Sequence, residues 1–173
     1  MATQEIAELQ RIFLSRLDTL SHILDVGEKH FPDFSVAMQE RLAPDMLPLG
    51  AQIAFACNQP RGFSQWLAGN PIDKLAPEAG SAERARSHIQ QTKQLVSGIN
   101  ADDRKLDEVK RIGLGPGRYC ELPARQYASD YLLPNLYFHI TTAYAILRAI
   151  GVPLGKADYM SFLAPHVRLE GDA

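Results

Sequence analysis

The chain has 173 residues, of which 46% are hydrophobic and 22% charged, and its formal net charge is −2. These values are ordinary for a globular protein and allow one domain with a proper core over residues 1–173. Phosphate binding requires clustered Lys and Arg, and the sequence holds no basic block, so we expect no nucleic acid partner. No run approaches the roughly 18 apolar residues of a membrane span, and we expect a cytoplasmic protein with no membrane partner.

The first half of the chain predicts two amphipathic helices and a connector. Apolar residues recur every three or four positions from Gln4 to Lys29, which is typical of a helix in a bundle. Residues 34–42 indicate a short helical connector. A second helix begins near Pro48, with Gln52 at the margin of its apolar face, and Pro60 is expected to kink or interrupt it.

A third helix is expected after a loop over residues 72–80, with Ser81 as its N-cap. Its His88 flanks the apolar face, which favours a boundary residue over a metal ligand. His22 and His30 in the first helix are better explained by solvent exposure and the helix dipole, respectively. Cys57 and Cys120 form no C-x-x-C motif, so we interpret them as reduced core residues.

Residues 102–122 depart from the helical pattern. The sequence IGLGPGRYCEL places β-forming residues on either side of Gly115–Pro116–Gly117, which predicts a hairpin-like excursion. No nucleotide-binding glycine motif is present, and no strand–helix unit surrounds these glycines. A phosphate-cradling loop is therefore not favoured.

The last helix is the clearest in the sequence, and it carries the best candidate site. After a helical lead-in over residues 124–133, Pro134 suits the first turn and Gly151 the end. Asn135 and His139 are four residues apart on its apolar margin, so they form either a satisfied polar pair or part of a pocket. Further candidates for the mouth of a pocket, each equally consistent with solvated helix surface, are Asp130, Tyr131, Tyr144 and Arg148.

The run DYLLPNLYFHITTAYAILRAIGVPLGKADYM, with RLAPDMLPL upstream, resembles an uncharacterised branch of the DinB-like (DNA-damage-inducible) superfamily. The resemblance implies an all-α, up-down-down-up four-helix bundle with the hairpin-like excursion before the last helix. It also implies a homodimer. The branch is a domain of unknown function, so the resemblance supplies a fold and no activity.

The wider superfamily commonly holds a divalent metal through three histidines. The resemblance places His139 on one of these positions, with Asn135 and Gln52 on the other two. Amide oxygens are weak ligands for zinc, nickel or iron, so the three positions suggest a degenerate metal site. Three interpretations stay open: a structural polar cluster, a pocket for a small polar ligand, and a metal site.

Two functions from different classes follow, and neither assigns a catalytic residue or a cofactor. The first is a dimeric, non-enzymatic or vestigial bundle with a polar pocket near His139, which binds a small molecule or a partner. The alternative is a divalent-metal-dependent enzyme, similar to thiol-dependent transferases, in which Asp45, Glu40 or water completes the coordination of His139. An interaction role for the C-terminal tail is a third hypothesis, and it rests on the apolar cluster of Tyr159, Phe162 and Leu163.

Overall fold

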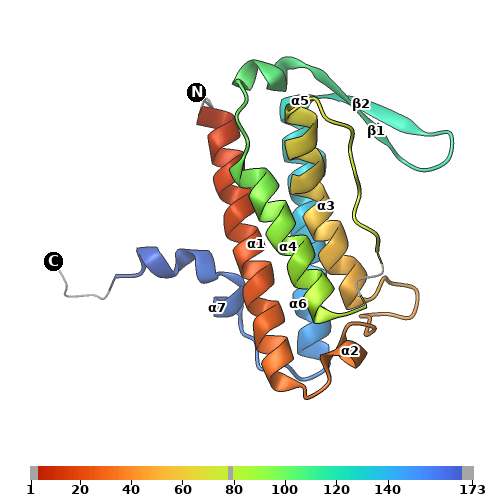
Figure 1. Cartoon of the computed structure of the whole chain (residues 1–173), viewed down its shortest axis with the longest axis vertical. Coiled ribbons are helices and arrows are strands. Elements are labelled where there is room, and N and C mark those ends of the chain that lie inside the picture. The colour runs from red at the N-terminus through yellow and green to blue at the C-terminus, as the bar shows by residue number, and fades with distance from the viewer. Residues whose placement is uncertain (1–3, 78–79, 169–173) are drawn as a thin grey trace.

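The computed structural model describes residues 4–77 and 80–168, and four long helices dominate it (Figure 1). These helices are α1 (Gln4–His30), α3 (Leu49–Leu67), α4 (Ala82–Ser97) and α6 (Leu133–Ala149). They lie side by side, and α3 packs against both α4 and α6. In Figure 1, α1 and α6 run from top to bottom, whereas α3 and α4 both run from bottom to top. None of the described helices is long and apolar enough to cross a membrane.

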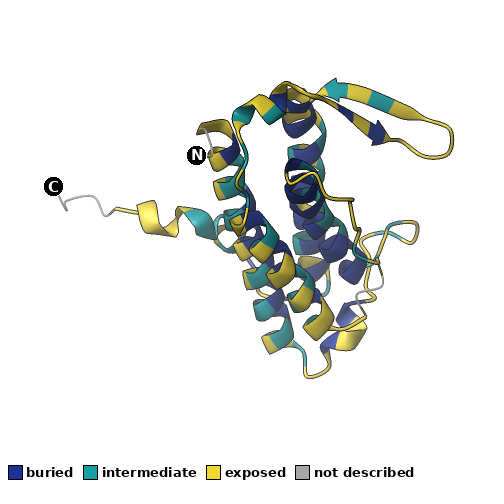
Figure 2. Ribbon diagram, turned by 45° about the horizontal axis from the view of Figure 1, so that its top comes forward, coloured by how far each residue is buried: buried dark blue, intermediate teal, exposed yellow. Residues whose placement is uncertain are grey.

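The bundle is held by one continuous apolar core. Figure 2 shows the buried residues on the faces that the helices turn toward one another, with exposed residues on the outside. Phe13 of α1 packs edge-to-face against Phe63 of α3, with ring centroids 5.6 Å apart. The carboxylate of Asp103, in the short helix η1 (Asp103–Asp107), accepts hydrogen bonds from the free amides of Glu5 and Ile6 at the start of α1.

Local sequence signals set most helix boundaries. Ser81 caps α4 as predicted, because its Oγ accepts a hydrogen bond from the Arg84 amide at 3.2 Å. Of the kink or interruption expected at Pro60, the interruption is wrong because α3 is continuous through that residue. The connector α2 (Phe34–Ala37) is shorter than predicted. Of the predicted loop over residues 72–80, residues 78–79 lie outside the described residues.

The predicted hairpin is present between η1 and α6. Strands β1 (Val109–Gly113) and β2 (Tyr119–Pro123) pair antiparallel. Gly115 and Gly117 have φ values of +102° and +69°, in the left-handed region that favours glycine. Figure 1 shows the hairpin extending sideways from one end of the bundle, next to the C-terminal end of α3.

The helical lead-in to α6 contains a widened turn. The short helix α5 (Ala124–Gln126) is followed by a π-helix, η2 (Tyr127–Leu132), which runs directly into α6. A π-helix is rare and frequently lies at a functional site. Here η2 connects the hairpin, through α5, to the start of α6.

The C-terminal tail packs back on the bundle only in part. It contains α7 (Lys156–Tyr159) and η3 (Ser161–His166). The Tyr159 hydroxyl lies 2.9 Å from the Thr141 hydroxyl of α6, and Arg16 of α1 lies over the Phe162 ring at 3.4 Å from its centroid. His22 is exposed as predicted, and its Nε2 also lies 2.8 Å from an Asp158 carboxylate oxygen.

Two helix glycines provide a test of this packing. A Cβ on Gly27 in α1 would lie 2.9 Å from Phe34 and 3.0 Å from Leu147, whereas one on Gly62 in α3 would meet Ile72 at an ordinary 3.6 Å. We expect Gly27→Ala to lower the free energy of unfolding by about 1–3 kcal/mol through overpacking. Gly62→Ala should raise it by about 0.5–1 kcal/mol, because alanine has the higher helix propensity. Urea unfolding of both variants measures this, and equal effects would contradict the close approach at Gly27.

Candidate functional site

A cavity of about 410 Å³ lies where α3, the hairpin, η2 and α6 meet. Such a volume is within the usual range for small-molecule sites. Its walls are formed by Leu47, Phe55, Asn58, Gln59, Gly62, Ile72, Lys74, Lys110, Arg111, Ile112, Gly113, Tyr127, Tyr131, Asn135 and His139. Two of the three site residues predicted from the sequence, Asn135 and His139, are in this wall.

The third predicted residue, Gln52, does not line the cavity, but it contacts His139, which does. The Gln52 side chain is 2% exposed, and its Oε1 lies 2.8 Å from His139 Nδ1. Its amide nitrogen donates to the backbone carbonyl of Leu47 at 3.0 Å. A carbonyl only accepts hydrogen bonds, so the Gln52 nitrogen must face Leu47 and its oxygen must face His139. In the neutral imidazole, the proton is therefore on Nδ1, and Nε2 carries the lone pair.

The His139 ring is held by aromatic neighbours as well. Phe55 of α3 stacks on it with centroids 5.4 Å apart and an interplanar angle of 21°, and Phe138 meets it edge-on at 5.3 Å. Burial among these groups lowers the pKa of His139 to about 4, because desolvation penalises the imidazolium form. His139 is therefore neutral near pH 7. Because Gln52 occupies Nδ1, Nε2 is the ring nitrogen left to bind a molecule in the cavity that His139 lines.

Asn135 lies in the same wall but makes a different bond. Its side-chain nitrogen donates to the carbonyl oxygen of Tyr131 at 2.6 Å, one turn earlier in the π-helix. Tyr131 in turn stacks on Tyr127, with centroids 5.6 Å apart. Gln52 and His139 thus meet directly, whereas Asn135 is bonded within its own helical segment. The three side chains do not converge on one point.

This arrangement does not fit the divalent metal that the DinB resemblance implies. Gln52 binds the Nδ1 edge of His139, so it cannot share an ion with Nε2 on the other edge. Neither Asp45 nor Glu40 lines the cavity. Within residues 4–77 and 80–168, no group of three His, Cys, Asp or Glu side chains is arranged to hold a metal ion. Gln52 instead acts as the residue that orients the histidine.

Sequence reasoning missed the positive charges of the cavity. Lys110 and Arg111 of β1 and Lys74 of the α3–α4 connection line it, and among the described residues no Asp or Glu does. The available signal was the alternation along β1, in which Lys110 and Ile112 point inward. That pattern shows which side chains are buried, but not which part of the bundle the hairpin covers. Of the other four suggested mouth residues, only Tyr131 lines this cavity.

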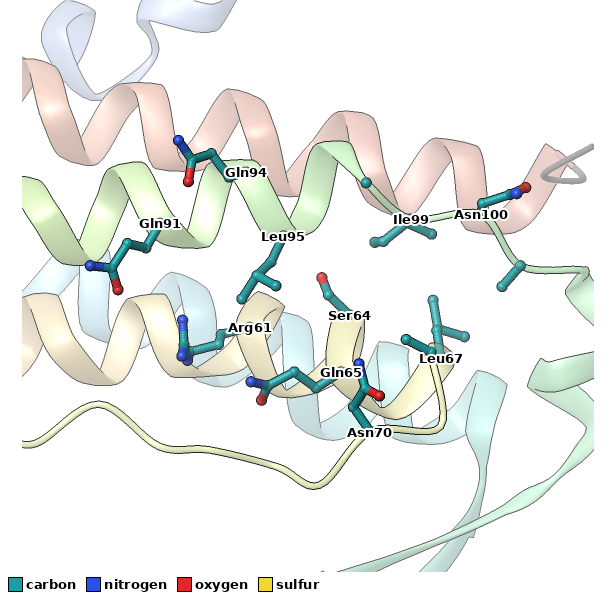
Figure 3. Close-up of a pocket in the computed structure, with 13 residues that line it drawn as sticks. Arg61, Ser64, Gln65, Leu67, Asn70, Gln91, Gln94, Leu95, Ile99 and Asn100 are labelled. Carbon is teal, nitrogen blue, oxygen red and sulfur yellow. The ribbon is translucent and has the colours of Figure 1, made fainter.

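A second cavity, of about 540 Å³, lies between α3 and α4 (Figure 3). Two polar side chains of its wall, Arg61 and Gln65, already have partners in the protein. Arg61 donates to the backbone carbonyl of Asp73 at 2.9 Å and pairs with its carboxylate, and Gln65 accepts from the Asp73 amide. These bonds tie the α3–α4 connection to α3. We interpret this cavity as structural and the His139 cavity as the candidate site.

The cysteines give no sign of reactivity. Cys57 is fully buried in α3, and burial raises the pKa of its thiol to about 12. Cys120 lies partly buried in β2, and both cysteines are free thiols. His88 is partly buried as predicted, although its Nε2 is enclosed without a hydrogen-bond partner among the described residues.

Comparisons with known proteins place the chain in a family. The sequence profile of DUF1993, a domain of unknown function, matches residues 8–160. The crystal structure of a DinB family member protein from Shewanella denitrificans is similar, with a TM-score of 0.75 and 26% sequence identity. That alignment covers 98% of this chain and 99% of the other. No curated protein matches the sequence significantly. Because the profile spans most of the chain, this protein belongs to the DUF1993 family, an uncharacterised DinB-like group.

Proposed function

We propose that this protein binds a small molecule in the His139 cavity, and that its scaffold is the up-down-down-up bundle implied by the DinB resemblance. The observation that carries the proposal is the chain of hydrogen bonds from Leu47 through Gln52 to His139. This chain fixes the imidazole proton on Nδ1 and leaves Nε2 as an uncharged acceptor for a ligand in the aromatic-lined cavity. A ligand with one N–H or O–H donor is the partner that such an acceptor selects.

The alternative, a metal-dependent enzyme, has one observation in its favour. A metal-binding histidine is usually oriented by a hydrogen bond to its other nitrogen, as Gln52 does here. However, one imidazole without further His, Cys, Asp or Glu ligands among the described residues is a weak site for zinc or nickel. We therefore place this function second.

One set of binding measurements separates the two functions. A thermal-shift screen of the full chain with small polar aromatic compounds should give hits, and calorimetry should confirm their affinities. We expect His139→Leu to weaken these hits by at least about tenfold, because it removes the only acceptor of a ligand hydrogen bond on that ring. The control is Asn70→Ala, which changes the second cavity and should leave affinity unchanged.

The same samples test the alternative. Elemental analysis of protein purified without chelator should find no stoichiometric metal, and soaking with zinc or nickel should not change this. About one metal ion per chain, lost in His139→Leu, would instead establish the metal-dependent function. A screen in which no compound binds at His139 would remove the support for the small-molecule function.

The neutral state of His139 predicts a pH-dependent stability. Its pKa of about 4 in the folded protein lies below the unfolded value of about 6.5, so the unfolded chain takes up the proton first. Stability is therefore complete above about pH 6.5 and falls, by on the order of 1–3 kcal/mol, as the pH decreases to about 4. His139→Phe, which retains the stacking on Phe55, should remove this part of the decrease. Urea unfolding at several pH values measures it, with the exposed His30→Gln as the unaffected control.

We also propose that the protein is a homodimer, as the resemblance implies. In support, Leu163 and Val167 at the end of the tail are 46% and 64% exposed, and η3 projects away from the bundle (Figure 1). Sedimentation equilibrium should give twice the chain mass, and Leu163→Ser should shift the equilibrium toward monomer without disturbing the contacts of α7. A monomeric wild-type chain at about 0.1 mM would exclude this assembly.

A further inference from the structure

We propose that the ligand of the His139 cavity is a small organic anion with a flat apolar body, and that Lys110 binds its acidic group. This inference rests on the proposed small-molecule function and adds the chemical class of the ligand. It begins from the charge of the cavity wall, to which the described part of the chain contributes three cationic side chains and no carboxylate. The whole chain has a net charge of −2, so the positive charge of this cavity is opposite in sign to the net charge of the protein.

Lys110 is the most unusual of the three cations. It is 9% exposed, on the inward face of β1. Lysine is almost never so deeply buried unless it is paired. Nevertheless, Lys110 forms no salt bridge or side-chain hydrogen bond with any residue in the described ranges 4–77 and 80–168. Its ammonium group lies instead near two aromatic rings, 5.1 Å from the centroid of Trp66 and 5.9 Å from that of Tyr127.

The neighbouring Lys105 provides a direct comparison. It also lies near the Trp66 ring, at 5.4 Å, but it pairs with the Glu108 carboxylate at 2.8 Å and does not line the His139 cavity. Five arginines and one further lysine of the described chain likewise pair with Asp or Glu: Arg11, Arg61, Arg86, Arg104, Arg125 and Lys93. In contrast, Lys74, Lys110 and Arg111 have no such partner there. Several exposed cations outside the cavity, such as Lys29 and Arg148, also form no salt bridge among the described residues. Of the two buried cations there, Arg61 pairs with Asp73, whereas Lys110 has no carboxylate partner.

The cost of burying Lys110 is only partly offset in the ligand-free protein. Desolvation, with a smaller contribution from the charge of Lys105, lowers the pKa of Lys110. The two aromatic faces compensate for a modest part of the lost hydration. A carboxylate or phosphate would supply the missing countercharge, and hydrogen bonds between charged groups are about twice as strong as neutral ones.

The aromatic wall determines the rest of the ligand. Two stacked pairs, Phe55 with His139 and Tyr127 with Tyr131, have interplanar angles of 21° and 22°. Flat faces of this kind favour a planar apolar body. The cavity volume of about 410 Å³ accommodates a molecule with one or two fused rings. His139 Nε2 then accepts a hydrogen bond from a donor on the ligand body.

A matched set of naphthyl compounds tests this inference by calorimetry on the full chain. Hydroxyl-substituted naphthoate and naphthyl phosphate carry the anion together with a donor for His139, and the naphthamide with the same hydroxyl has the same body and donor without charge. We expect at least one anion to bind about tenfold or more tightly than naphthamide. The tighter of the two anions then shows whether the natural acidic group is a carboxylate or a phosphate.

Variants at Lys110 assign the effect to that residue. Lys110→Met retains the apolar stem against Trp66 and should lower anion affinity at least about tenfold, while naphthamide affinity stays unchanged. Lys110→Arg should keep the preference for anions. The control Lys105→Met removes the paired lysine at the same tryptophan and should change anion affinity by no more than about twofold. The midpoint of thermal unfolding should not fall in Lys110→Met, because the variant removes a desolvated charge.

The outcomes separate this inference from the function on which it rests. If naphthamide and the anions bind equally, or if Lys110→Met weakens all of them alike, the anionic ligand class is wrong and the small-molecule site still stands. If no member of the set binds at about 1 mM, the proposed function itself loses its support.

Discussion

The site depends on one hydrogen bond, between His139 Nδ1 and Gln52 Oε1, which joins α6 to α3. Its direction is set by the backbone carbonyl of Leu47, which leaves the Gln52 amide only one orientation. The position of a single proton on an imidazole is therefore decided at the start of another helix. Since the two helices also form the core of the bundle, the geometry that stabilises the fold is the geometry that sets the chemistry of the cavity.

Carboxylates lie on the outer surface of the protein, whereas the groups around this hydrogen bond are neutral or positively charged. Carboxylates across the outer surface pair with arginines and lysines, for example Asp25 and Glu28 with Arg86. Around His139, the polar groups are amides, hydroxyls and cations, and the imidazole is uncharged. A site with this composition is poor in the anionic ligands that a divalent cation prefers. The same residues that make metal binding weak make the space suitable for a molecule that brings its own negative charge.

Local signals in the sequence predicted the elements that depend on neighbours in the chain. Ser81 caps a helix, the Gly115–Pro116–Gly117 turn forms a hairpin, and Pro134 lies in the first turn of α6. The interruption expected at Pro60 failed because packing of α3 on both sides overrides the loss of one backbone bond. Lys110 could not be foreseen as a site residue, since the position of the hairpin relative to α3 and α6 is a tertiary property. The orientation of the Gln52 amide depends on its contacts with both Leu47 and His139. The spacing of apolar residues in the sequence does not predict such contacts.

The π-helical turn before α6 has a consequence for the shape of the whole cavity. In η2 the amide of Leu133 bonds to the carbonyl of Ala128, five residues earlier, whereas an α-helix would bond residues four apart. Removing one residue from this turn would restore α-helical spacing and rotate everything before it by about 100° relative to α6. That rotation would carry Tyr127 and the hairpin away from the face of His139. The number of residues between the hairpin and α6, independent of their identity, therefore fixes the angle at which the cavity closes.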